Sequence, residues 1–147
     1  MADLNQLQQV LELSQQQEQQ AQQKLSQATA QLERHQQQLA QIQQYRFDYL
    51  GQMNRQKGQA LNANHYHQYH QFISQLDKAS EAENQAMHQA MHAQNQCRQE
   101  WQTLQQKCRA MEQLIDKRLA LLQIQAAKQE QKATDEFAIQ AFLRRQA

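Results

Sequence analysis

The sequence lacks the residues that most often form turns. The 147-residue chain has no proline and only two glycines, Gly51 and Gly58. Globular domains of this size normally use several of each in their turns and loops. We therefore expect a chain with almost no loops.

Strong net charge and long apolar runs are also missing. The formal net charge is +1, and acidic and basic residues are interspersed. The strong field that nucleic-acid or anionic-membrane binders usually carry is therefore not expected. No stretch approaches the roughly 18 apolar residues of a membrane span. The polar start, MADLNQLQQV, does not resemble a signal peptide. We expect no nucleic-acid partner and no direct membrane insertion.

Cysteine is scarce as well. The two cysteines, Cys97 and Cys108, would lie about 16 Å apart on one helix, too far for a disulfide between them. Free thiols in a chain without an export signal favour a reducing cytoplasm.

Strong helix formers make up most of the chain. Glutamine accounts for more than a quarter of the residues, and leucine, isoleucine and methionine recur at regular intervals among the glutamines. Gln, Ala, Leu, Lys, Arg, Glu and Met all favour the helix because few other conformations compete with it. This composition predicts an almost wholly helical chain.

Mostly apolar positions recur every seven residues in two long stretches. The first stretch contains the rows Leu4, Leu11, Glu18, Leu25, Leu32, Leu39, Arg46, Met53 and Leu7, Ser14, Ala21, Ala28, His35, Ile42, Tyr49. The second contains Tyr66, Ile73, Ser80, Met87, Gln94, Trp101, Cys108, Ile115, Leu122 and Tyr69, Leu76, Glu83, Ala90, Cys97, Leu104, Met111, Arg118. A sustained seven-residue repeat presents a narrow stripe to a partner helix in a left-handed coiled coil.

The two stretches are separated by GQMNRQKGQALNAN, which holds both glycines and three asparagines. A short connection between two heptad helices makes them antiparallel neighbours. We predict an all-α fold, an antiparallel two-helix coiled-coil hairpin forming a single domain over residues 1–147. The first helix is expected over 3–57, the turn over 58–64 and the second helix over 65–145. The second helix is longer, so we expect it to overhang without a partner beyond about residue 122.

Residues within the break offer the expected helix ends. Gly58 is suited to end the first helix, and Asn62 or Asn64 to cap the second. With the turn centred near residue 60, His35 falls opposite Glu83, and a contact between them is expected. Polar residues at such seam positions fix the register of a coiled coil at a cost in stability.

The sequence gives little support for metal binding, catalysis or base stacking. His88 and His92 stand four residues apart, and His67 and His70 three, but a closed zinc site needs about four ligands, so we interpret them as surface histidines. A helical hairpin has no pocket in which a nucleophile and a base could converge, and no glycine-rich phosphate loop is present, so we expect neither an enzyme nor a cofactor. Six of the nine aromatic residues lie beside the turn, yet the basic residues there are too few for single-strand binding.

A protein-docking surface remains. Aromatic and aliphatic side chains form one stripe on each helix below the turn, and Tyr is favoured at interfaces because it buries area and keeps a hydrogen bond. We expect some rings to pack in the seam, with Tyr45 and Phe72 at its flank. Apolar side chains on the overhang suggest a second docking surface, although a frayed tail or an oligomer contact is the alternative. These tail residues are Phe137, Ile139, Phe142 and Leu143.

Four stretches resemble the FliJ family, small cytoplasmic components of the bacterial flagellar type III export apparatus. They are YRFDYL from Tyr45, YHQFISQLDKA from Tyr69, WQTLQQK from Trp101, and ATDEFAIQA near the end. The resemblance implies a hairpin similar to the stalk (gamma) subunit of rotary ATPases. It implies three partners: the hexameric export ATPase, the cytoplasmic domain of the export-gate membrane protein, and substrate-specific export chaperones. It also implies a cytoplasmic location, peripherally associated with the inner membrane at the flagellar base.

The resemblance further implies a gate-binding surface on both helices. Its positions here are Gln38, Ile42, Tyr45, Tyr49, Phe72, Leu76, Ala79 and Glu83. Ile42 and Glu83 differ from the side chains expected at those positions. The tail residues would serve the ATPase ring or a chaperone. The alternatives left open are the equivalent stalk protein of a virulence-type secretion system and a nucleic-acid-binding coiled coil.

Overall fold

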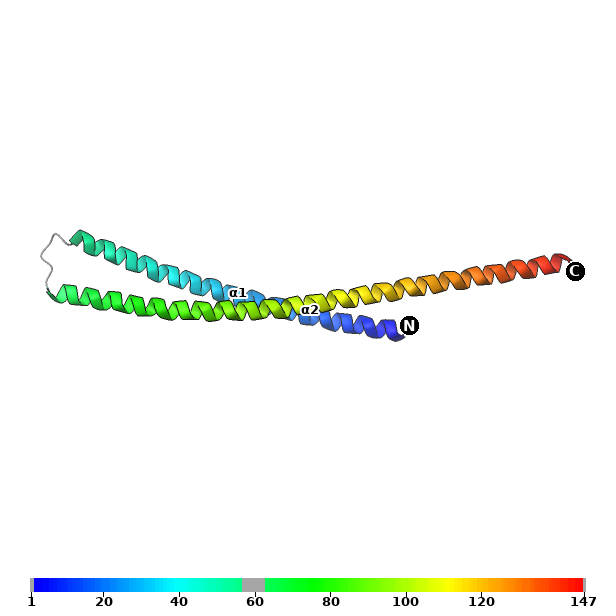
Figure 1. Ribbon diagram of the computed structural model, residues 1–147, viewed down its shortest axis with the longest axis horizontal. Coiled ribbons are helices and arrows are strands. Elements are labelled where there is room, and N and C mark those ends of the chain that lie inside the picture. Colours follow the sequence, from blue (N-terminus) through cyan, green and yellow to red (C-terminus); the bar gives the residue numbers. More distant parts are fainter. Residues whose placement is uncertain (1, 57–62, 147) are drawn as a thin grey trace. The chain divides into compact units, whose positions relative to one another are not determined.

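The computed structural model describes residues 2–56 and 63–146, all of them helical. Helix α1 spans Ala2–Gln56 and helix α2 spans Ala63–Gln146 (Figure 1). No strand occurs in either range. The two long helices pack as an antiparallel hairpin, which confirms the predicted fold class.

The helix bounds lie within two residues of those expected. Gly58 and Asn62, to which we assigned helix-terminating roles, lie outside the described residues, as does most of the predicted turn. Asn64 lies inside α2, after Ala63, rather than before its first residue. The prediction that the whole chain is one domain stays a prediction. The chain divides into two compact units, which we call the hairpin unit (residues 19–102) and the terminal unit (residues 1–18 and 103–147).

In the hairpin unit, the seam follows the heptad rows. Within this unit, every residue of those rows that the structure describes is buried or half-buried except Tyr66. Ala21 and Leu32 are its most buried apolar residues, at 6% and 8% exposure. Tyr66 was wrongly placed in the seam, since it is exposed and its ring instead packs edge-on against His70, with ring centroids 4.3 Å apart.

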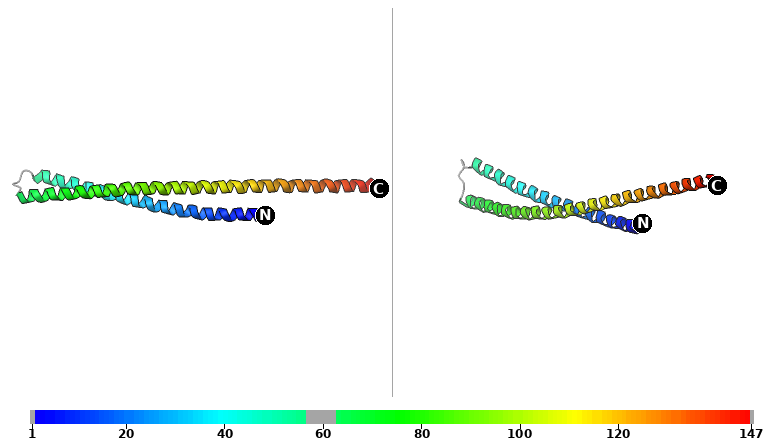
Figure 2. Two further views of the ribbon diagram at one scale, coloured as in Figure 1. Left: turned by 60° about the horizontal axis from the view of Figure 1, so that its bottom comes forward. Right: turned by 45° about the vertical axis from the view of Figure 1, so that its right-hand side comes forward.

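In the terminal unit, the heptad residues Ser14, Cys108 and Ile115 are buried. Arg118, also expected in the seam, is exposed. It lines a shallow pocket of about 360 Å³ together with Asp3 and Leu7, where α1 begins and few α1 residues remain to cover it. Figures 1 and 2 show α2 continuing past the start of α1. From residue 123 to residue 146, only Ala141 is not exposed.

Candidate functional site

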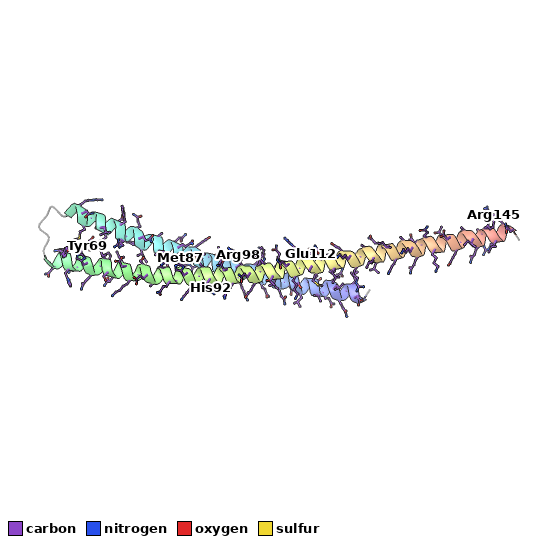
Figure 3. The ribbon with its side chains drawn as sticks, in the orientation of Figure 1. Tyr69, Met87, His92, Arg98, Glu112 and Arg145 are labelled. Atoms are coloured by element: carbon purple, nitrogen blue, oxygen red, sulfur yellow. The ribbon has the colours of Figure 1, made fainter. Side chains whose placement is uncertain are left out.

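Three aromatic rings meet near the turn-side end of the hairpin unit. Tyr49 of α1 stacks on Tyr69 of α2, with ring centroids 4.9 Å apart and an interplanar angle of 11°. Tyr49 also contacts Phe72, with centroids 4.6 Å apart and ring planes tilted by 50°. Tyr69 is labelled in Figure 3. Offset stacking and tilted contacts are the favoured arrangements of aromatic pairs. Tyr49 therefore ties the two helices together.

Two aromatic rings in this part of the hairpin unit, Phe72 of this contact and Tyr45 of α1, remain open to solvent. Tyr45 is 65% exposed and Phe72 is 40% exposed, whereas Tyr49 is half-buried. Tyr45 also lines a shallow pocket of about 200 Å³ with Gln41, Gln44 and Asp48 on α1. The rings thus divide as expected, with Tyr49 packed inward and Tyr45 and Phe72 at the flank.

The aliphatic positions of the predicted surface continue this flank. Ile42 and Leu76 are half-buried, and Ala79 is exposed. We call the resulting surface the aromatic face. It consists of Ile42, Tyr45, Tyr49, Phe72, Leu76 and Ala79. The aromatic face thus combines half-buried seam residues with exposed residues.

The other two predicted positions, Gln38 and Glu83, are engaged within the chain. His35 Nδ1 donates to Glu83 Oε2 at 2.9 Å, the contact expected from the sequence. The Gln38 amide faces the same carboxylate. Oriented with its nitrogen toward Glu83, it donates to Oε1 at 2.8 Å and to Oε2 at 3.2 Å. Sequence reasoning missed the role of Gln38, although His35 and Gln38 stand three residues apart on one face of a helix. We call these three residues the Glu83 cluster.

Other polar contacts also join the two helices. Arg46 Nε donates to Asp77 Oδ1 at 2.8 Å, with both side chains about half exposed. Further from the turn, Gln94 Nε2 donates to Thr29 Oγ1 at 3.0 Å. Burial raises the pKa of the Tyr69 hydroxyl, and the neighbouring Tyr49 raises it further, partly offset by Arg46. The Tyr69 hydroxyl is therefore neutral at physiological pH.

The histidines in the described part of the chain are not grouped as ligands of a metal centre. His88 and His92 are exposed, and His92 Nε2 lies 3.4 Å from Gln96 Nε2 rather than against another histidine. His67 Nε2 likewise lies 3.3 Å from Gln71 Nε2. Among residues 2–56 and 63–146, no three His, Cys, Asp or Glu side chains are grouped so that they could hold a metal ion.

The tail residues are among the most exposed apolar residues. Phe137 is 73% exposed, and Ile139, Phe142 and Leu143 are each 58–60% exposed. All four lie in the terminal unit. Phe47 is also highly exposed, at 74%. It follows Tyr45 by two residues, a rotation of about 200° around α1, and therefore points away from the aromatic face. No helix in the described part of the chain is long and apolar enough to cross a membrane.

An antiparallel helical hairpin with aromatic side chains exposed on one flank is typical of coiled-coil interaction proteins. The family model described as "Flagellar FliJ protein" matches residues 3–147, so the chain belongs to the FliJ family. Members of this family are non-catalytic components of the flagellar export apparatus. No curated protein and no solved structure matches the chain.

Proposed function

We propose that this protein is a stalk-like adaptor of the flagellar export apparatus whose aromatic face docks on the cytoplasmic domain of the export-gate membrane protein. One observation carries the assignment. Tyr45 and Phe72 are exposed, while Tyr49, which contacts Phe72, is fixed in the seam by Tyr69. Aromatic side chains held on a rigid support lose little conformational entropy on binding, which favours them as interface anchors.

The terminal unit supplies the second part of the proposal. We assign the tail residues to the hexameric export ATPase, with the overhanging part of α2 entering the pore of the ring and promoting its activity. A helix about 10–12 Å wide fits a narrow central channel. The apolar side chains exposed there give the ring, or a substrate-specific export chaperone, a surface to grip.

If these partners are correct, we propose that the protein works in the cytoplasm, at the inner face of the membrane below the flagellum, held there by its partners. The two surfaces belong to different units of the chain. An adaptor with two surfaces can occupy the ring and the gate together. Coupling between them then requires that the contacts differ between nucleotide states of the ring.

The decisive experiment is a binding titration with the isolated cytoplasmic domain of the gate protein. Tyr45→Ala combined with Phe72→Ala is expected to weaken binding at least tenfold, as truncated interface anchors usually do. Circular dichroism should remain that of the wild type, because both rings lie at the flank of the seam. Loss of helicity together with binding would assign the rings to packing instead.

Phe47→Ala is the matched control. It removes a ring that is even more exposed than Tyr45, from the same helix, but outside the aromatic face. Binding by this variant should equal that of the wild type. Equal losses in the control and the double variant would mean that the aromatic face is not the docking surface.

A further inference from the structure

The Glu83 cluster spans the seam of the hairpin unit at the end of the aromatic face. The Glu83 side chain is only partly exposed (24%), and its carboxylate pairs with His35 of α1 at 2.9 Å. The Gln38 amide, oriented with its nitrogen toward Glu83, donates to the same carboxylate at 2.8 Å. A carboxylate held in a seam costs desolvation, which only good hydrogen bonds offset. Both groups come from the opposite helix, and Glu83 meets His35 and Gln38 together only when the two helices are correctly aligned.

Two contacts between the helices define that alignment. His35 faces Glu83, and Tyr49 stacks on Tyr69. In antiparallel helices the residue numbers of facing pairs have a constant sum, and for both of these pairs the sum is 118. In a register shifted by one heptad, Ala28 or Ile42 would replace His35 opposite Glu83, and neither side chain can pair with the carboxylate, although Gln31 or Tyr45 would then take the place of Gln38. Most other seam positions of this unit are apolar and would tolerate such a shift, because one aliphatic layer resembles the next.

We propose that His35, Gln38 and Glu83 fix the register of α1 against α2, and that Gln38 and Glu83 are positioning residues of the aromatic face rather than contacts to a partner. The polar cluster selects one alignment among several that the apolar seam permits. Correct alignment brings Tyr45 of α1 and Phe72 of α2 to the same flank. The part concerning the face rests on the proposed function, and the part concerning the register does not.

The native Cys97 provides a test of the register. The residue numbers of Ala21 and Cys97 also sum to 118, so these two positions face each other in the native register. Ala21 lies buried in the seam. With Cys108→Ala in every variant, Ala21→Cys is expected to form an intrachain disulfide with Cys97 under mild oxidation. Ala28→Cys, one heptad further, reports only a shifted register. In the otherwise native chain, the first reporter should cross-link nearly completely and the second not at all.

Replacing the pair with leucine should remove the selection. In His35→Leu with Glu83→Leu, helicity is kept, because leucine is well suited to seam positions. The Ala21→Cys cross-link should fall at least threefold, and the Ala28→Cys cross-link should appear. Exchanging the two residues, His35→Glu with Glu83→His, should restore the native pattern. If the leucine variant keeps the native pattern alone, the Tyr49–Tyr69 stack or the connection sets the register and the proposal is overturned.

Binding to the gate domain separates the two roles of Glu83. The exchanged variant presents a histidine at position 83 yet restores the cluster, so a positioning role predicts wild-type affinity. A native cross-linking pattern with weakened binding would show that Glu83 itself contacts the partner. If the wild-type chain fails to bind the gate domain, the proposed function fails, while the cross-linking result still decides the register.

Discussion

Tyr49 and Tyr69 stack with nearly parallel rings across the two helices, with ring centroids 4.9 Å apart. The stack lies beside two rings that remain exposed, Tyr45 and Phe72. Aromatic residues of one cluster therefore divide into a structural pair and an accessible pair. Substitutions can separate these roles, because stability should respond to one pair and binding to the other.

Tyr49→Ala is expected to destabilise the hairpin unit by about 1–3 kcal/mol. It removes the stack on Tyr69 and the contact with Phe72, and each aromatic pair contributes roughly 0.5–1.5 kcal/mol beyond the area it buries. Urea unfolding followed by circular dichroism measures the change. Phe47→Ala, at a 74% exposed position, is the control and should stay within about 0.5 kcal/mol of the wild type. Equal effects of the two substitutions would contradict a structural role for Tyr49.

Gly51→Ala is expected to stabilise the protein by about 0.5–1 kcal/mol. Gly51 lies inside α1, and a Cβ atom added there meets no atom within 4 Å. Glycine in a helix interior costs roughly that amount relative to alanine. The midpoint of urea unfolding should rise. The reverse change at an exposed helical position, Ala40→Gly, should lower it by a similar amount. A lower midpoint for Gly51→Ala would indicate that α1 bends or opens at this residue.

Unfolding stability is expected to decline above about pH 9. Burial, followed by a hydrogen bond with Glu18, raises the pKa of the Cys108 thiol above its ordinary value of 9.0. A group whose pKa is higher in the folded state contributes its full stabilisation below the unfolded pKa and loses it as the pH rises through the folded pKa. Tyr69 behaves in the same way from about pH 10, since burial raises its pKa also. Unfolding titrations at pH 7, 9 and 10 measure the decline.

Cys108→Ala isolates the contribution of the thiol. This variant should lose less stability than the wild type between pH 7 and pH 10, because of the two groups only Tyr69 remains to titrate.

The burial of Cys108 also predicts how fast each of the two thiols reacts. Cys108 is 3% exposed, so iodoacetamide should modify the half-buried Cys97 many times faster in the folded protein. Equal rates for the two thiols would mean that the terminal unit opens readily.

The sequence predicted the fold well because two helices with one seam leave few alternatives. The heptad repeat identified the seam, and the pairing of His35 with Glu83 followed from counting residues away from the break. Two seam predictions were wrong, because the repeat alone does not decide what a side chain packs against. Arg118 follows the repeat, but it lies where α1 begins and has little to pack against. Tyr66 follows it too, yet its ring lies against His70 on its own helix.

The candidate site was harder to predict, because exposure at a flank depends on side-chain directions that a repeat does not specify. Spacing placed Gln38 and Glu83 on the same stripe as the aromatic residues. In the structure the Gln38 amide also faces the Glu83 carboxylate, which pairs with His35 as well. No periodic pattern distinguishes a polar residue turned toward a partner from one hydrogen-bonded within the chain.

Phe137→Ala combined with Phe142→Ala tests the tail. Both rings lie in the overhanging part of α2, 73% and 60% exposed, so their loss should change the free energy of unfolding by less than about 0.5 kcal/mol. If the tail enters the ATPase ring, stimulation of ATP hydrolysis by this variant should fall several-fold, while gate binding stays intact. Gln131→Ala with Gln140→Ala removes two exposed polar side chains from the same segment and serves as the control. Full stimulation by the double phenylalanine variant would remove the tail from the ring contact and leave the chaperones as its remaining partner, which a binding titration of the same variant with an export chaperone would then decide.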